Sequence, residues 1–337
     1  MVIVFGATGF IGLYTVEALV KAGYEVIGTG RNPQLGEMIE DLGGRFIQVD
    51  ITKAEDYKKL PTHGVEAVIL LAGLLPAHVS ADLVEKENAA DYFEVNVIGA
   101  IQVLEYCRIN GIKKVIGNCS YSDVSGAWGT GRTITEEEPR SFKFTGDHAV
   151  YVISKNACND VMQYYNEQHG LQCSWFRFPP VYGVGPHGTI KVDGKSYKSG
   201  IATFIDNVEQ GKDIELWGDP HISRDIIYVK DVADAYVKAI QSDRARGLYN
   251  MTSGVGLDLE TQAKTVIEVF GKGKGSRIVY RPEKKNNTPS YLYSMEKAKQ
   301  DFGFVPKYTD FKDMMEDYKS EWESGRWQAL VERKETC

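Results

Sequence analysis

The stretch that decides the fold is Val2-Ile-Val-Phe-Gly-Ala-Thr-Gly-Phe-Ile-Gly12, at the start of the chain. Its four apolar residues predict a buried strand, and Gly6, Gly9 and Gly12 predict a tight turn that leads into a helix. Glycines let the backbone approach a pyrophosphate, which the free N–H groups at a helix N-terminus attract. The spacing G-x-x-G-x-x-G differs from the commoner G-x-G-x-x-G, and an ordinary strand-to-helix turn is the alternative. Motifs elsewhere in the chain are needed to distinguish a pyrophosphate site from an ordinary turn.

Strand-like and helical segments alternate through the first half of the chain. We predict strands at residues 2–5, 25–29, 45–49, 67–71, 114–118 and 174–178, and helices at 12–22, 34–42, 89–110 and 150–169. This βαβ rhythm, with strands that lack polar alternation, is typical of a parallel sheet covered by helices on both faces. The predicted fold class is therefore α/β, a Rossmann-type doubly wound parallel sheet.

The pattern changes after Pro179-Pro180, where prolines and glycines interrupt it as far as Gly200. Shorter helices are predicted at 201–210, 229–242, 259–270, 295–302 and 311–323, with a polar loop at 281–289 and a polar tail from residue 325. A chain of 337 residues is longer than one core usually supports. We therefore predict a nucleotide-binding domain of residues 1–178 with parts of 220–255, and a smaller C-terminal substrate-binding lobe and tail of residues 179–219 and 256–337.

Charge and cysteine content narrow the class of protein. The 39 basic and 46 acidic residues give a net charge of −7, which argues against nucleic acid or an anionic membrane as a partner. The five cysteines are odd in number and lack C-x-x-C spacing, which indicates reduced thiols in the cytoplasm. No apolar run reaches the length of a membrane span, and the six scattered histidines do not suggest a metal site.

Tyr151 and Lys155 lie four residues apart in a predicted helix, so their side chains share one face. An ammonium there favours the tyrosinate and lowers the Tyr151 pKa, which suits proton transfer between an alcohol and a ketone. A surface tyrosine stacked on a lysine stem is the alternative. Ser120 follows the predicted strand 114–118, at the edge where parallel sheets bind ligands, and can hold the substrate oxygen. Ser122 competes for this role, and either serine can instead cap a turn.

Further motifs follow in order along most of the chain. They are Gly6-x-x-Gly9-x-x-Gly12, Asp50-Ile51, Leu71-Ala72-Gly73, Asn96-Val97-x-Gly99, Ser120, Tyr151-x-x-x-Lys155, Arg177-x-Pro179-x-Val181-Tyr182-Gly183 and Arg224-Asp225-x-x-Tyr228-Val229-x-Asp231-Val232-Ala233. In this array the chain resembles the extended short-chain dehydrogenase/reductase family, in its NAD-dependent epimerase/dehydratase group that acts on nucleotide sugars. The array is specific for the family and much less specific for a substrate.

The resemblance implies a dinucleotide site along the sheet edge. It assigns the cofactor to Gly6, Thr8, Gly9, Phe10, Ile11, Gly12, Arg31, Asp50, Ile51, Leu71, Ala72, Gly73, Asn96, Tyr151, Lys155 and Pro179. Within this set, Phe10 and Ile11 would contact the pyrophosphate, and Lys155 the nicotinamide ribose. Asn96 would support the active-site helix, although a buried asparagine that satisfies a carbonyl is an equal alternative.

Arg31 bears on the form of the cofactor. It follows the second predicted strand, at the place where a carboxylate would bind a ribose 2′-hydroxyl, and it can instead accept a 2′-phosphate. This favours NADP slightly over NAD. The alternative is an arginine that only covers the adenine face, and several family members with a neutral or basic residue here use NAD.

The resemblance also places the diphosphate of a nucleotide sugar on Arg224 and Arg281, because guanidinium groups match phosphate oxygens. A structural ion pair of Arg224 with Asp225 or Asp231 is the alternative. Substrate contacts are also expected from Ser120 and Tyr151.

Two departures from the family pattern narrow the reaction. Pro180 stands where similar epimerases have a substrate-binding asparagine, and Tyr121 and Ser122 replace the Asp-Glu pair of the 4,6-dehydratases. The second departure argues against a 4,6-dehydratase. The long loops 121–148 and 187–200 are expected to form the lip of the substrate site.

The leading hypothesis is a nucleotide-sugar epimerase, most simply at C4, that oxidises the sugar transiently with bound NAD(P)+. Tyr151 would act as the base, Ser120 would orient the oxygen, and Lys155 would lower the Tyr151 pKa. The alternative is an NADP-dependent reductase of a keto-sugar nucleotide or another carbonyl compound. A nucleotide sensor without turnover is a third class. By resemblance we also expect a homodimer that forms a four-helix bundle from residues 89–110 and 150–169.

Overall fold

A seven-stranded sheet forms the centre of the protein, in a computed structural model that describes residues 1–76, 89–146, 148–186, 189–192, 195–286 and 288–332. The strand order is β14-β7-β5-β4-β1-β2-β3, and every neighbouring pair is parallel. The strands are β1 Val2–Phe5, β2 Val26–Gly30, β3 Arg45–Gln48, β4 Ala67–Leu70, β5 Lys114–Asn118, β7 Gln172–Arg177 and β14 Gly247–Asn250. The predicted doubly wound α/β fold class is confirmed.

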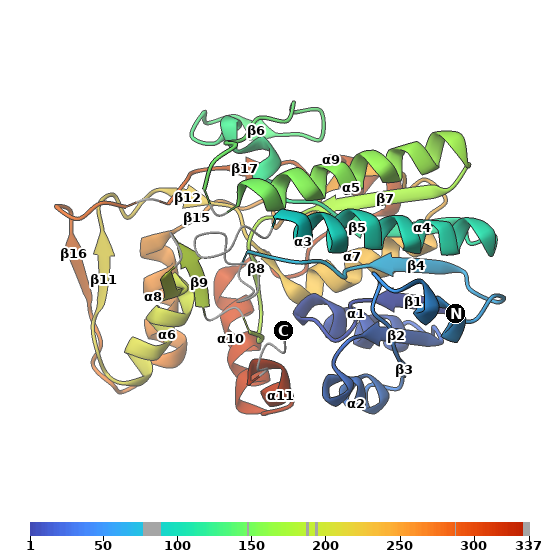
Figure 1. The fold of residues 1–337 in the computed structure, drawn as a ribbon. Helices are drawn as coiled ribbons and strands as arrows, with labels where there is room; N and C mark the ends of the chain where they lie inside the picture. The colour runs from blue at the N-terminus through green and yellow to red at the C-terminus, as the bar shows by residue number, and fades with distance from the viewer. Residues whose placement is uncertain (77–88, 147, 187–188, 193–194, 287, 333–337) are drawn as a thin grey trace.

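Helices cover both faces of this sheet, so the protein has three layers in this half (Figure 1). One face carries α1 Phe10–Lys21, α2 Pro33–Asp41 and α7 Val229–Gln241, and the other carries α4 Gly99–Ile109 and α5 Ala149–Gln168. In β1, Val2 and Val4 point into the first core, whereas Ile3 and Phe5 point into the second. Because successive side chains of a strand alternate between two buried faces, the strand shows no polar alternation.

A smaller lobe has a core of its own. Its elements are α6 Gly200–Glu209, β11 Ile214–Trp217, α8 Leu259–Phe270, β16 Ile278–Arg281 and α10 Phe311–Glu323. Carboxylates start two of its helices, because Asp258 accepts from the Thr261 N–H at 2.7 Å and Asp310 from the Lys312 N–H at 2.8 Å. Short strand pairs complete the chain: β8 Val181–Tyr182 with β13 Ile227–Tyr228, β9 Thr189–Val192 with β10 Lys195–Lys198, β12 Ser223–Arg224 with β15 Leu257–Asp258, and β6 Thr133–Ile134 with β17 Leu292–Tyr293.

Several predicted elements differ in detail. The helix predicted at 89–110 is α3 Ala89–Phe93, a π-helical segment η3 Glu94–Ile98, and α4. The loop predicted at 121–148 contains a 3-10 helix, η4 Tyr121–Ala127, and the strand β6. The strand β14 was not predicted, because Gly247-Leu-Tyr-Asn is too short to show a strand pattern. No helix of the described residues is both long and apolar enough to cross a bilayer.

The C-terminal segment is packed rather than a free polar tail. Trp327 and Leu330, in and beside α11 Gln328–Val331, are buried in the core that contains β1 and α1. The Trp327 ring lies 4.5 Å from the Tyr14 ring of α1, centroid to centroid. Its indole N–H donates to Glu321 at 2.5 Å. The end of the chain therefore covers the helix that follows the glycine loop.

An ion pair at the surface also joins the C-terminal segment to α1. The Arg326 guanidinium donates to both carboxylate oxygens of Glu17 on α1, at 2.7 and 3.0 Å. Burial alone would raise the Glu17 pKa, but hydrogen bonds from Arg326 and Lys21 outweigh it and lower this pKa from 4.5 to about 2. The Glu17 side chain is 12% exposed and that of Arg326 is 34% exposed, so water screens the pair in part.

Glu17→Gln is expected to lower the free energy of unfolding by about 1–2 kcal/mol near neutral pH. A carboxylate whose pKa is lower in the folded state stabilises that state above its unfolded pKa, and this contribution is lost as the pH falls through the folded value. The difference between wild type and variant should therefore shrink as the pH falls from 4.5 toward 2. Urea unfolding of both proteins across this range measures it. A difference that stays constant with pH would contradict the assignment to Glu17.

Candidate active site

The glycine loop between β1 and α1 is packed so closely that only glycine fits at two positions. Gly6 has a φ of +81°, and a Cβ there would lie 2.5 Å from the Ala72 backbone nitrogen. A Cβ on Gly12 would overlap the Gly6 carbonyl oxygen. Gly9 is the N-cap of α1, and no side chain caps this helix end. The first turn of α1 thus begins at the carboxyl edge of the sheet without a side-chain cap, as a pyrophosphate site requires.

Phe10 and Ile11 begin α1 but are buried to different degrees. The Phe10 ring is buried and packs edge-to-face on Tyr14, with centroids 5.8 Å apart. It also fills the space that a Cβ on Gly185 would occupy. Ile11 is only partly buried, and Thr8 is buried against the last residue of β2. Phe10 is therefore a core residue, and only its backbone N–H can contact a pyrophosphate.

Three residues of the predicted cofactor set, Arg31, Asp50 and Ile51, lie beyond the ends of β2 and β3. Arg31 has an exposed side chain, and its carbonyl accepts from Gln48 Nε2 at 3.1 Å. Asp50 Oδ1 accepts from the Thr52 N–H at 3.0 Å and the Thr52 hydroxyl at 2.8 Å. Ile51 is buried in the second core. Among these residues the Arg31 side chain is the one most open to a ligand.

Asn96 connects the end of β4 to α5 through buried hydrogen bonds. Its Oδ1 accepts from the Leu74 N–H at 2.7 Å, and its Nδ2 donates to the Leu74 carbonyl at 3.2 Å and to Ser154 Oγ at 3.0 Å. Ser154 donates in turn to the Tyr151 carbonyl at 2.8 Å. The segment 71–73 leads from β4 to this point, and Gly73 lies against the amide of Asn96. Asn96 thus satisfies a carbonyl and supports the α5 helix at the same time.

Ser120, Tyr151 and Lys155 lie around the junction of β5 and α5. Ser120 is buried, and its Oγ accepts a hydrogen bond from the Ser122 N–H at 3.2 Å. This hydrogen bond caps the start of η4. Tyr151 is in the first turn of α5, close to the residues on either side of Ser120. Lys155 lies one turn later and donates from Nζ to Asn118 Oδ1 at 2.7 Å. Ser120 thus lies two residues after the end of β5, whereas Ser122 lies within η4.

The pKa of Tyr151 differs from the predicted one. Burial raises this pKa above its ordinary value, and the nearby Cys119, Tyr121 and Tyr92 raise it further. Lys155 hydrogen-bonds to Asn118 and is not among the main causes of this shift. The predicted direction is therefore wrong, because burial dominates and raises the Tyr151 pKa instead of lowering it.

Arg224 carries a half-buried charge with few partners. Its Nη2 lies 3.5 Å from the Tyr182 hydroxyl, and its Nε is buried without a hydrogen-bond partner among the described residues. The two carboxylates proposed as ion-pair partners bind elsewhere. Asp225 accepts from Thr252 and from the Tyr293 N–H, and Asp231 accepts from backbone N–H groups of 307 and 308. A half-buried guanidinium that meets no carboxylate of the described residues is costly, so it favours an anionic ligand.

Aromatic side chains surround the same arginine, and the sequence did not single them out as a group. Tyr121, directly after Ser120, stacks on Trp128 with centroids 5.4 Å apart and lies 5.8 Å from the Tyr291 ring. Tyr291 forms a backbone bridge with Arg224. Tyr121 thus extends from the Tyr151 side of the site to Arg224. The signal that could have found them is the pair of tyrosines at 291 and 293, shortly after the predicted polar loop 281–289.

Arg281 is placed differently from Arg224. It ends β16, is partly exposed, and donates from Nε to Glu215 at 3.1 Å. Glu215 also accepts from Lys284 at 2.6 Å. The Arg281 charge is therefore already compensated, unlike that of Arg224. Pro179 is buried just after β7, and the carbonyl of Pro180 accepts from a backbone N–H of β13 at 3.2 Å.

A buried ion pair holds the turn that carries Ser120. Arg177, the last residue of β7, donates to Asp123 in η4 at 2.8 Å, and both side chains are almost completely buried. Arg177 also donates to Asn250 Oδ1 at 3.2 Å. Of the lip loops predicted at 121–148 and 187–200, residues 147, 187–188 and 193–194 lie outside the described residues.

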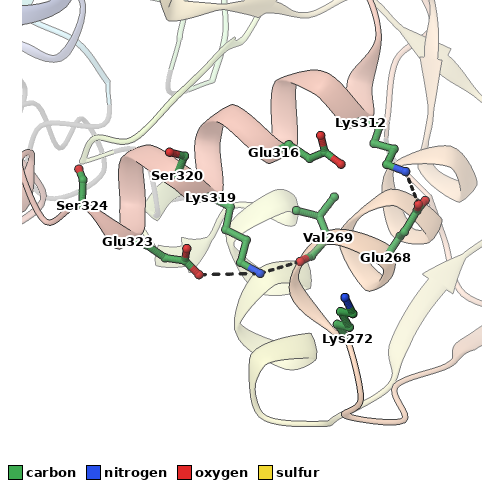
Figure 2. Close-up of a pocket in the computed structure, with 9 residues that line it drawn as sticks. All are labelled: Glu268, Val269, Lys272, Lys312, Glu316, Lys319, Ser320, Glu323 and Ser324. Atoms are coloured by element: carbon green, nitrogen blue, oxygen red, sulfur yellow. Dashed lines mark hydrogen bonds and ion pairs between the residues drawn. The ribbon is translucent and has the colours of Figure 1, made fainter.

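A separate surface depression lies between α8 and α10, and Figure 2 shows its lining. Lysines and glutamates alternate around it. Lys312 pairs with Glu268, and Lys319 donates to the Val269 carbonyl at 2.9 Å and lies 3.8 Å from Glu323. Its charges largely compensate one another, and none of the predicted cofactor, catalytic or substrate residues lines it. It is therefore not the active site.

Relatives of known activity resemble this chain over nearly its whole length. It is 27% identical over 332 residues to the UDP-glucose 4-epimerase of Halalkalibacterium halodurans, with 94% of this chain and 93% of that protein covered. It is 25% identical over 317 residues to the UDP-glucose 4-epimerase of Mycolicibacterium smegmatis, with 90% and 93% covered. The Thermus thermophilus UDP-glucose 4-epimerase in complex with NAD superposes with a TM-score of 0.73 at 25% identity, covering 96% of this chain and 98% of that one.

The cofactor in these comparisons is NAD. The matching family is described as NAD dependent, and the Thermus thermophilus structure holds NAD. The preference for NADP that Arg31 suggested finds no support in either. The uncapped start of α1 and the glycines that admit no Cβ fit a dinucleotide of this kind.

The family match extends from β1 through β14, and thus over the whole seven-stranded sheet with the glycine loop, Ser120, Tyr151, Lys155 and Arg224. Residues 2–252 of this chain match the family described as NAD dependent epimerase/dehydratase. The chain belongs to the NAD dependent epimerase/dehydratase family.

Proposed function

We propose that this protein is a nucleotide-sugar 4-epimerase that works with bound NAD. The observation that supports this most is the half-buried Arg224, which has no carboxylate partner among the described residues and lies across Tyr121 from Tyr151. A nucleotide sugar has a diphosphate to meet the guanidinium and a sugar to meet the phenol. The 4-epimerases among the relatives act on such substrates by name. The proposed location is the cytoplasm, where the buried free cysteines at 107, 119, 158 and 173 remain reduced.

In the proposed reaction, Tyr151 takes the proton of the sugar hydroxyl and later returns it, while Ser120 donates a hydrogen bond to the same oxygen. Bound NAD+ would supply a reversible hydride acceptor for the sugar carbon. Lys155 would hold the nicotinamide ribose, and an ammonium near the phenol opposes the effect of burial on the Tyr151 pKa. The keto-sugar would turn between the two transfers, so that the hydride returns to the opposite face of the same carbon and the proton to its oxygen.

The reaction itself is tested by incubating the protein with UDP-glucose or UDP-galactose and following the sugar protons by NMR. We expect each to convert into the other without added dinucleotide. If neither these sugars nor their N-acetylated forms change at C4, the proposed activity is wrong.

An NADP-dependent reductase is the second candidate, favoured by the exposed Arg31 beyond β2. The two candidates differ in how they hold their cofactor. An epimerase returns its hydride in each cycle, so purified protein should release near-stoichiometric NAD+ on denaturation, identified by mass spectrometry. A protein that is purified empty and binds NADPH reversibly would favour the reductase.

Arg224→Met is expected to weaken UDP binding about a hundredfold, because charge-assisted hydrogen bonds to phosphate contribute about 1.5–3 kcal/mol each. Its folding stability should stay the same or rise, since the variant no longer buries an uncompensated charge. Isothermal titration calorimetry with UDP and thermal unfolding measure the two effects. Arg281→Met is the matched control and should weaken binding less, because Glu215 already compensates its charge. Equal losses in both variants would contradict the role given to Arg224.

We also infer a homodimer through α3, α4 and α5. Large apolar side chains are exposed on these helices and the segment between them, namely Phe93, Ile98, Ile109 and Tyr164. Exposed apolar residues gathered on neighbouring helices favour a partner helix face. Light scattering should give twice the mass of one chain, and Ile98→Glu should shift it toward one. A wild-type protein that is monomeric at micromolar concentration would exclude the dimer.

A further inference from the structure

The contact between Lys155 and Asn118 joins the two elements on which the chemistry is proposed to depend. Asn118 is the last residue of β5, at the carboxyl edge of the sheet, and Lys155 lies in the second turn of α5. Lys155 Nζ donates to Asn118 Oδ1 at 2.7 Å. The lysine is only 5% exposed, so this contact is made largely out of water. A neutral amide oxygen therefore holds a buried ammonium group.

The surroundings of Lys155 give it little else to bind. No carboxylate of the described residues lies within 4 Å of its Nζ, and Asn118 is the hydrogen-bond partner that the structure gives this nitrogen. Among the ionisable neighbours are the thiols of Cys119 and Cys158. A long, flexible side chain with a single strong acceptor takes its position from that acceptor.

We propose that Asn118 is a positioning residue that fixes the Lys155 ammonium at the sheet edge for binding of the dinucleotide ribose. This rests on the proposed role of Lys155 as a ribose ligand. Dinucleotides bind along the carboxyl edge of such a sheet, and Asn118 is itself part of that edge. A group that is already held in place loses less conformational freedom when its ligand arrives. Asn118 thereby strengthens cofactor binding without having to touch the cofactor.

The test is a double-mutant cycle with NAD+ affinity as its readout, measured by calorimetry on protein freed of bound nucleotide. Asn118→Leu keeps the size of the side chain and removes the acceptor, and Lys155→Met removes the ammonium. We expect the dissociation constant to rise about tenfold for Asn118→Leu and at least as much for Lys155→Met, with no further rise in the double variant. Effects that multiply in the double variant would show that Asn118 acts on the fold and not through Lys155, and would overturn the proposal.

A second variant separates loss of the acceptor from general disturbance of β5. Asn118→Asp keeps an oxygen at the same place and should bind NAD+ within about threefold of the wild type. If it binds as weakly as Asn118→Leu, the acceptor is not what matters and the proposal is wrong. Should Asn118→Leu fail to fold, Asn118→Ser, whose hydroxyl is too short to reach, takes its place in the cycle.

The same data distinguish this proposal from the proposed function. If Lys155→Met leaves NAD+ affinity unchanged, the role of Lys155 as a ribose ligand fails and the positioning role fails with it. If Lys155→Met weakens binding and Asn118→Leu does not, only the positioning role fails. Absence of epimerisation would leave the cycle of NAD+ affinities unaffected.

Discussion

Tyr151→Phe is expected to lower the kcat of epimerisation about a thousandfold, because the phenol is the group that exchanges a proton with the sugar hydroxyl. Phenylalanine retains the ring that packs beside Tyr92, 6.3 Å away between centroids, and against Leu74. The variant should therefore fold as the wild type does and bind NAD+ and UDP with nearly unchanged affinity. Conversion of UDP-galactose measures kcat, and calorimetry measures binding.

The matched control is Tyr164→Phe on the same helix. Tyr164 is 53% exposed and lies far along α5 from the first turn, so loss of its hydroxyl should leave kcat unchanged. A Tyr151→Phe variant that turns over at the wild-type rate would contradict the role of Tyr151 as the proton-transferring group. A wild-type protein without turnover on any nucleotide sugar or carbonyl compound would instead favour the nucleotide sensor.

Trp327→Ala is expected to cost about 3–5 kcal/mol of folding stability, the range for a buried aromatic residue replaced by alanine. Trp327 is 2% exposed, packs on Tyr14 and donates its indole N–H to Glu321. Its removal leaves a cavity beside α1 and an unpaired carboxylate oxygen. We also expect weaker NAD+ binding, because α1 begins at the pyrophosphate site. Urea unfolding and calorimetry measure the two effects.

Trp322→Ala provides the comparison, since Trp322 is five residues earlier and 42% exposed. Its loss should change stability by less than about 1 kcal/mol, as for most exposed residues. Equal effects from the two tryptophans would contradict a specific role for the C-terminal segment. A Trp327→Ala protein that unfolds more easily but binds NAD+ normally would confine that role to stability.

Local patterns in the sequence predicted the elements that carry the site. The strand at 114–118 and the helices at 259–270 and 311–323 have the predicted bounds, because apolar runs and capping carboxylates are local signals. The glycine loop was also predictable, since a positive φ and close backbone contacts leave a glycine in the sequence. Spacing alone was enough to place Tyr151 and Lys155 on one face of a helix.

What the sequence could not predict depends on contacts between distant segments. No spacing indicates that Asn118 binds Lys155, or that Tyr291 lies beside Tyr121, since each pair is brought together only by the finished fold. Trp327 was assigned to a polar tail because its sequence neighbours are polar. In the fold the neighbouring Arg326 forms ion pairs with Glu321 and Glu17, and Trp327 itself is buried. The predicted direction of the Tyr151 pKa shift was wrong, because the prediction considered the charge of Lys155 and not the burial of the phenol.

The packing of α11 on α1 also has a consequence for how the protein is made. Residues 10–21 leave the ribosome early, but the aromatic side chain that covers them follows some three hundred residues later. Contacts of such long sequence separation form late in folding. During synthesis the apolar face of α1 around Tyr14 therefore stays exposed to solvent. Chaperones can bind it there, and it can associate prematurely with other chains. The nucleotide-binding half of this protein is completed only when α11 has been released.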